Sequence, residues 1–149
     1  MSSNSSKKYF FISILSIMLF FMSTSVFALD IELRTYKNRV CYDGDTCYIT
    51  ISVLPGKLQK MSVRILGIDT PEIRGKCPEE KNLALRARIF ANKVFKKAKN
   101  IEYKNLRWGK YGGRVLSDVY LDRKLYSNLI IEKGLARPYD GGTKHGWCK

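Results

Sequence analysis

One long amphipathic pattern divides this chain into two β-rich parts, and this order limits the folds that the chain can adopt. Pro78-Glu79-Glu80 predicts a helix start, because proline suits the first turn and acids favour the positive end of the helix dipole. Apolar residues then recur at helical spacing, and basic residues fill the positions between them. The apolar stripe consists of Leu83, Ala87, Phe90, Ala91, Val94 and Ala98. We expect the stripe to pack on a sheet and the basic face to be solvated.

Segments rich in β-forming residues lie on both sides of this helix. They cover residues 31–42, 47–54 and 61–68 before it and residues 101–106 and 115–121 after it. A second, short helix is predicted over residues 125–133 and is ended by Gly134. Five strands with a helix between the third and fourth predict an α+β protein, namely a five-stranded OB-fold β-barrel with two flanking helices. The tail over residues 139–143 is turn-like and too short for a third long helix.

Residues 1–28 have the pattern of a signal peptide. Lys7 and Lys8 precede an apolar run, and Val26-Phe27-Ala28 follows as a small-residue cleavage site. The alternative is an uncleaved membrane anchor, although the apolar run from residue 9 to 21 is short for a spanning helix. We therefore expect an exported protein, secreted or periplasmic, whose mature domain is residues 29–149. After cleavage we expect no stable membrane association.

The charge of the chain favours a polyanionic partner. Its 27 lysines and arginines against 13 acids give a net charge of +14. Nucleic acid, an anionic membrane surface and an acidic polysaccharide all fit that charge. A membrane-surface protein would carry bulky apolar residues on an exposed helix face, whereas the stripe here is what a core needs. The single histidine excludes nucleases that use two histidines or a histidine-metal finger.

Four cysteines in an exported chain predict two disulfides. Three pairings are possible, and we favour Cys41–Cys47 with Cys77–Cys148. Cys41 and Cys47 are symmetric about Gly44, so a hairpin turn there would place them opposite each other. The second bridge would pin the C-terminus to the loop that carries Cys77. A zinc site is the alternative, but the spacings and the single histidine do not suit it.

Charged residues gather in three short segments. They are Asp43-Gly44-Asp45-Thr46, the run from Arg64 to Glu72, and Lys110-Tyr111-Gly112-Gly113-Arg114. Carboxylates suit a hard divalent cation and arginine suits a phosphate, so the segments together predict metal-assisted phosphodiester cleavage. In a regular strand Arg64 and Asp69 would lie on opposite faces, so a bulge at Gly67 or a strand end by Ile68 must bring them together.

These segments, followed by Gly134-Leu135-Ala136, resemble the staphylococcal nuclease-like (thermonuclease) family over roughly residues 38–139. The resemblance implies an OB-fold endonuclease, a phosphodiester hydrolase that cleaves DNA and RNA with Ca²⁺. We expect such an enzyme to act as a monomer.

The resemblance also implies a metal site. Asp45 and Asp69 would ligate calcium through their carboxylates, and Thr70 through its backbone carbonyl. Asp43 would lie nearby without touching the ion. Calcium takes oxygen ligands with loose geometry, and water and phosphate would complete its shell.

Further roles are implied for the reaction and for the substrate. Arg64 and Arg114 would clamp the scissile phosphate, and Glu72 would be the general base. The positions implied to contact the substrate are Lys110 and Tyr111, at a terminal phosphate, and Tyr139, in the substrate pocket.

The chain departs from the best-known member of the family in three ways. Gly112-Gly113 holds one extra residue before Arg114, the long C-terminal helix is missing, and the four cysteines are additional. We expect Cys77–Cys148 to replace stability that the missing helix would give. The alternative function is a catalytically inactive nucleic-acid-binding OB-fold module, but such modules usually lose the acids or arginines that this chain retains.

Overall fold

The computed structural model describes residues 29–149, and the predicted signal peptide, residues 1–28, lies outside the described residues. The elements are β1 (Ile31–Leu33), β2 (Thr46–Ile51), the short 3₁₀ helix η1 (Gly56–Gln59), β3 (Lys60–Ile65), β4 (Ile68–Asp69), α2 (Pro78–Lys97), β5 (Ile101–Trp108), β6 (Arg114–Leu121), β7 (Lys124–Leu125), α3 (Tyr126–Glu132) and β8 (Arg137–Pro138). No helix between residues 29 and 149 is both long enough and apolar enough to cross a membrane.

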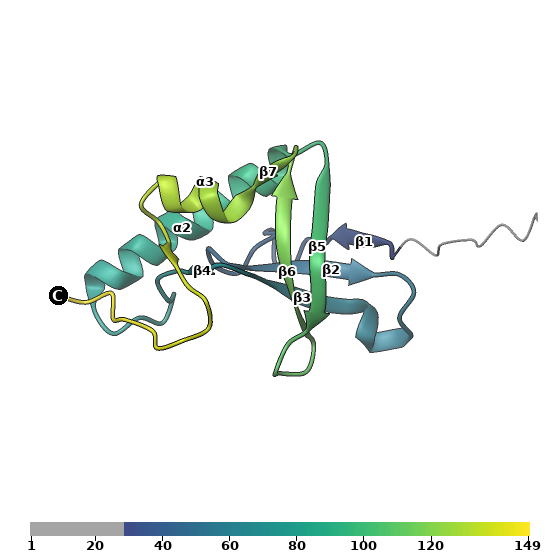
Figure 1. Cartoon of the computed structure of the whole chain (residues 1–149), viewed down its shortest axis with the longest axis horizontal. Coiled ribbons are helices and arrows are strands. Elements are labelled where there is room, and N and C mark those ends of the chain that lie inside the picture. Colours follow the sequence, from purple (N-terminus) through teal and green to yellow (C-terminus); the bar gives the residue numbers. More distant parts are fainter. Residues whose placement is uncertain (1–28) are drawn as a thin grey trace, which may run out of the picture.

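The main sheet has the strand order β1-β2-β3-β6-β5, and β7 adds to β6. Strands β3 and β6 run parallel, with Ser62 opposite Arg114, whereas the other neighbours in this sheet are antiparallel. The sheet curls into a half-barrel, and the two helices lie against it (Figure 1). The predicted α+β class and OB-like architecture are therefore confirmed.

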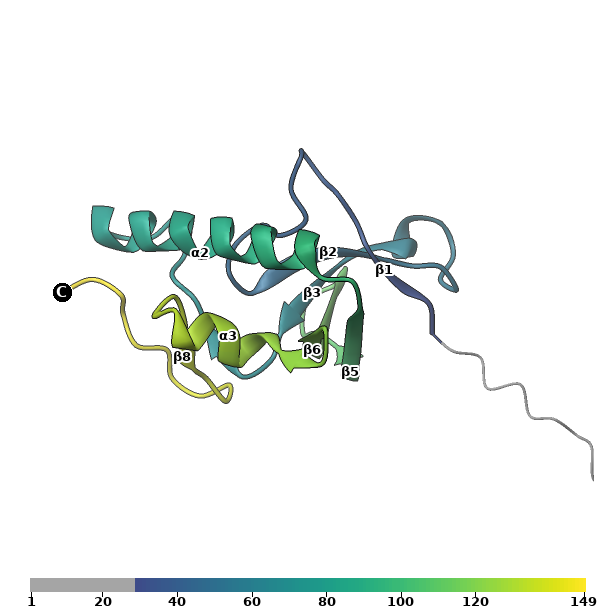
Figure 2. The same ribbon diagram turned by 90° about the horizontal axis from the view of Figure 1, so that it is seen from above.

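The core lies between the curled sheet and the helices α2 and α3, which run side by side (Figure 2). Helix α2 forms over the predicted span, with Pro78 in its first turn. The apolar face is rotated from the predicted one, because Ala84, Ala87, Ala91 and Phe95 are buried while Leu83, Phe90 and Val94 are only partly so. The Phe95 ring meets Tyr126 of α3 edge to face, with centroids 4.9 Å apart. Small alanines on this face let α2 pack closely on the turn at Gly44.

Two predicted strands differ from the structure. The strand predicted over residues 31–42 ends at Leu33, because the chain turns at Lys37 and Asn38, which both have positive φ. The strand predicted over residues 61–68 ends at Ile65, and β4 follows after a turn at Gly67 with φ +79°. Periodicity alone could not show the turn at Gly67, since apolar residues continue on both sides of it.

Both predicted disulfides are present. Cys41–Cys47 spans the Asp-Gly turn, and the two residues also form an antiparallel bridge. Cys77–Cys148 joins the residue before α2 to the C-terminal tail. The tail is fixed a second time, where Arg137 of β8 pairs with Asp69 of β4. Two distant parts of the chain thus meet beside Asp69.

Candidate active site

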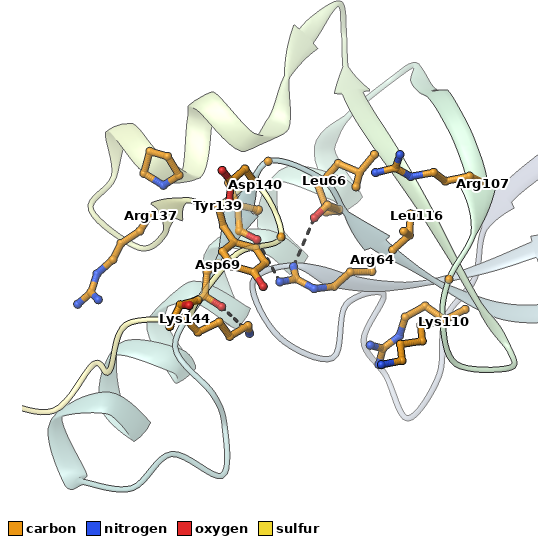
Figure 3. Close-up of a pocket in the computed structure, with 18 of the residues that line it drawn as sticks. Arg64, Leu66, Asp69, Arg107, Lys110, Leu116, Arg137, Tyr139, Asp140 and Lys144 are labelled. Atoms are coloured by element: carbon orange, nitrogen blue, oxygen red, sulfur yellow. Dashed lines mark hydrogen bonds and ion pairs between the residues drawn. The ribbon is translucent and has the colours of Figure 1, made fainter.

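An open cleft of about 1260 Å³ lies between the β5–β6 loop and the C-terminal tail (Figure 3). Six cationic side chains line it, whereas the lining carboxylates are Asp69 and Asp140. These cations are Arg64, Arg107, Lys110, Arg114, Arg137 and Lys144. A concave surface with this excess of positive charge attracts polyanions.

Register places the arginines on one wall of the cleft. Arg64 of β3 lies opposite Leu116 of β6, and Leu116 lies opposite Arg107 of β5. Arg114 is two residues before Leu116, so it shares that face of the sheet. The extra glycine is absorbed by the loop, where Gly113 has φ +73°, and Arg114 still reaches the cleft wall. The parallel pairing of β3 and β6 therefore brings the two predicted clamp arginines together.

Arg64 and Asp69 would lie on opposite faces of a regular strand. The turn after β3 changes the direction of the chain between them, and both line the cleft. Gly67 adopts a left-handed conformation that glycine tolerates best. The Arg64 guanidinium then folds along the turn, and its Nη2 donates a hydrogen bond to the Ile68 carbonyl at 3.0 Å. Its Nη1 forms an ion pair with Asp45 Oδ2 at 2.6 Å. Arg64 thus links the predicted metal acid Asp45 to the turn that presents Asp69.

Asp45 is buried and held by several donors. Its Oδ2 accepts hydrogen bonds from the Thr70 hydroxyl at 2.7 Å and the Thr70 amide at 3.1 Å. Its Oδ1 accepts one from the Thr46 hydroxyl at 3.1 Å. Asp43 lies close by and accepts from the Asp45 amide. Burial, and then the Asp45 charge, raises the pKa of Asp43 to about 7.

The turn that carries these acids is fixed from the helix side. The Tyr126 hydroxyl, fully buried in α3, donates a hydrogen bond to the Gly44 carbonyl at 2.6 Å. A Cβ on Gly44 would lie 2.7 Å from Thr70 Cγ2 and 3.0 Å from Ala87 Cβ. Only glycine fits there, so the turn packs directly on Thr70 and on α2.

Asp69 is held by the C-terminal tail. Lys144 Nζ lies 2.6 Å from Asp69 Oδ1, and Trp147 Nε1 donates a hydrogen bond to Asp69 Oδ2 at 3.1 Å. Figure 3 shows Lys144 and Asp69 pointing toward each other beside Tyr139. Partial burial lowers the pKa of Lys144, but the hydrogen bond and the charge of Asp69 outweigh it, so the net shift is upward.

Glu72 stands at the rim of the site, where its side chain is 60% exposed and lies 3.5 Å from Lys144 Nζ. Its loop is fixed by Glu80, which accepts hydrogen bonds from the amides of Glu72 and Lys76. A Cβ on Gly75 would lie 2.5 Å from the Glu80 carboxyl group, so a side chain there would displace that group from its hydrogen bonds. Glu80, expected only to stabilise the helix dipole, therefore positions the loop that carries Glu72.

The predicted substrate residues all line the cleft. Lys110 and the 66% exposed Tyr111 lie on the β5–β6 loop. Tyr139 follows β8, and its amide donates a hydrogen bond to the Gly67 carbonyl at 3.0 Å. The pairing of β8 with β4 thus sets Tyr139 beside the turn that presents Asp69.

The acids beside the cleft, of which Asp69 lines it, have the chemistry that a hard divalent cation requires. Asp43, Asp45 and Asp69 are nearly buried, and oxygen ligands are what calcium prefers. Burying carboxylates is costly unless positive charge compensates them. The raised pKa of Asp43 indicates that the cations near it, Arg64 included, compensate this group only in part. Asp45, Asp69 and Thr70 are the groups that would hold the ion.

Sequence reasoning missed several residues of this site, because no motif marks them. They are Glu80, Arg107, Tyr126, Arg137, Lys144 and Trp147. The favoured Cys77–Cys148 bridge was one available signal for the tail. Cys77 follows Glu72 closely and Cys148 follows Lys144 closely, so the bridge must bring those two side chains near each other.

Residues 62–145 match the family model described as staphylococcal nuclease homologue. The matched segment covers more than half of the chain and runs from β3 to the tail. It includes Arg64, Asp69, Glu72 and Arg114, while Asp43 and Asp45 lie before it. The order of acids and arginines, the curled sheet and this match agree, and the chain belongs to the staphylococcal nuclease homologue family.

Proposed function

We propose that this protein is an exported calcium-dependent nuclease that hydrolyses phosphodiester bonds in DNA and RNA. The observation that carries the proposal is the shared cleft wall of Arg64, Arg114 and Asp69. Two arginines beside buried carboxylates suit a phosphodiester that must be held while its charge increases. The family match supports the same class of reaction.

Each residue of the site has a distinct role in the proposed reaction. Arg64 and Arg114 bind the scissile phosphate, and they stabilise the extra charge on its oxygens in the transition state. Glu72, exposed at the rim, takes the proton of the attacking water. Lys110 and Tyr111 contact a terminal phosphate, and Tyr139 lines the pocket beside it. Calcium, held by Asp45, Asp69 and the Thr70 carbonyl, would polarise the phosphate and neutralise part of its charge.

The proposal also includes the processing and the location of the protein. Residues 29–149 would be the mature monomeric domain, released after cleavage of a signal peptide over residues 1–28. The two disulfides suit an oxidising compartment, so we place the protein outside the cell or in the periplasm.

The first test is digestion of single-stranded DNA by the oxidised mature protein, with calcium and with chelator. Glu72→Gln is the test variant, and Glu79→Gln, an exposed acid at the start of α2, is the matched control. We expect calcium-dependent cleavage that falls about 10²–10⁴-fold in Glu72→Gln and is unchanged in Glu79→Gln. DNA binding without cleavage under any divalent ion would instead support the inactive binding module.

A further inference from the structure

We propose that Lys144 is a tethered counter-ion of Asp69 that competes with the divalent cation, and thereby lowers the affinity of the metal site. The inference rests on the proposed function, because it concerns the cation that the nuclease would use. It assigns a specific task to Lys144 of the C-terminal tail, a residue that the sequence-based site did not include.

Lys144 contacts two of the predicted site carboxylates. Its ammonium lies 2.6 Å from Asp69 Oδ1 and 3.5 Å from Glu72 Oε1, between two carboxylates of the site. The second oxygen of Asp69 accepts a hydrogen bond from Trp147. Both Asp69 oxygens are therefore engaged by the tail, so a cation that ligates Asp69 competes with these donors for the carboxylate.

The tail is built to hold Lys144 in place. Arg137 Nη1 donates a hydrogen bond to the Gly146 carbonyl at 2.9 Å, and its guanidinium lies 3.7 Å from the centre of the Trp147 ring. The Cys77–Cys148 disulfide closes the tail immediately after Trp147. A side chain that is tethered in this way has a high effective concentration at its partner. Lys144 therefore competes better than a free surface lysine would.

Charge repulsion determines whether Lys144 raises or lowers the affinity for the cation. An ammonium and a divalent cation repel each other when both lie against one carboxylate. Binding of the cation therefore weakens the Lys144–Asp69 ion pair and favours movement of the ammonium away from Asp69. Lys144 also lines the cleft and lies 5.7 Å from the centre of the Tyr139 ring, so it has room on the substrate side. Removing the Lys144 charge should strengthen cation binding.

The test is calorimetric titration of calcium into the oxidised mature protein without nucleic acid. The variants are Lys144→Gln, which removes the charge, and Lys144→Arg, which keeps it. Lys149→Gln is the matched control, because it removes one charge from the same exposed tail. We expect roughly a two- to fivefold lower Kd for Lys144→Gln, in the range typical of a partly exposed ion pair, and less than a twofold change for the other two. Circular dichroism and calcium-free melting will show that each variant is folded.

Luminescence of terbium, a calcium substitute that indole can sensitise, gives a second readout. Trp147 contacts Asp69, so terbium held there should be sensitised at lower concentration in Lys144→Gln. An unchanged or higher calcium Kd in Lys144→Gln, or an equal change in Lys149→Gln, would overturn the inference. Absence of calcium binding in every variant would overturn it as well. Calcium binding without any DNA cleavage would overturn only the proposed function.

Discussion

The Cys77–Cys148 disulfide should be the larger covalent contribution to the stability of this fold. Its two cysteines are 71 residues apart in the sequence, whereas Cys41 and Cys47 are 6 apart. In the chain-entropy model, a loop of that length restricts the unfolded chain by about 4 kcal/mol at 25 °C, against about 2 kcal/mol for the short loop. We therefore expect Cys77→Ser/Cys148→Ser to lose about 4 kcal/mol of unfolding free energy.

Urea denaturation of the oxidised proteins measures this loss directly. For a domain of this size, about 4 kcal/mol corresponds to a fall in Tm on the order of 15 °C. The slope of free energy against urea should also rise, because the unfolded chain without the bridge is more extended. A loss below about 1 kcal/mol with an unchanged slope would refute the reasoning, because it would show that the bridge hardly restricts the unfolded chain.

Three further predictions test the site. Arg114→Lys should lower kcat about a hundredfold with little change in Tm, since lysine lacks the planar fork; steady-state kinetics and melting check this. Tyr126→Phe should cost about 1–2 kcal/mol in urea denaturation, because the buried Gly44 carbonyl loses its donor. The native pKa of Asp43 is about 7 against an ordinary 3.8, so the native state holds more protons between these values and loses stability as pH rises through them. When pH rises from 5 to 8 without metal, the free energy of unfolding of Asp43→Asn should therefore fall less than that of the wild type.

Much of the fold could be predicted because local signals agreed with the tertiary structure. Pro78 begins α2 and Gly134, with φ +66°, follows α3, where proline and glycine are favoured for local steric reasons. The Cys41–Cys47 pair followed from symmetry about Gly44. A bulge at Gly67 or a strand end by Ile68 was expected between Arg64 and Asp69, and the structure has a turn at Gly67, after which both residues line the cleft.

The features that could not be predicted depend on contacts that sequence periodicity does not encode. The parallel pairing of β3 and β6 joins segments on either side of α2, and nothing local specifies it. The buried face of α2 consists of small alanines together with Phe95, whereas the large Leu83 and Phe90 are only partly buried. Lys144 and Trp147 lie in an irregular tail, where the disulfide, β8 and long-range contacts to Asp69 determine their position.

The parallel pairing of β3 and β6 has a kinetic consequence. The Ser62 amide bonds the Gly113 carbonyl across a sequence separation of 51, and helix α2 must be accommodated between them. Long-range pairing of this kind forms late, because the loop must close before any contact compensates its entropy. The two clamp arginines therefore remain apart in any species that contains only β1 to β3 and α2. Phosphate binding should appear in the last refolding phase, after helical structure has already formed.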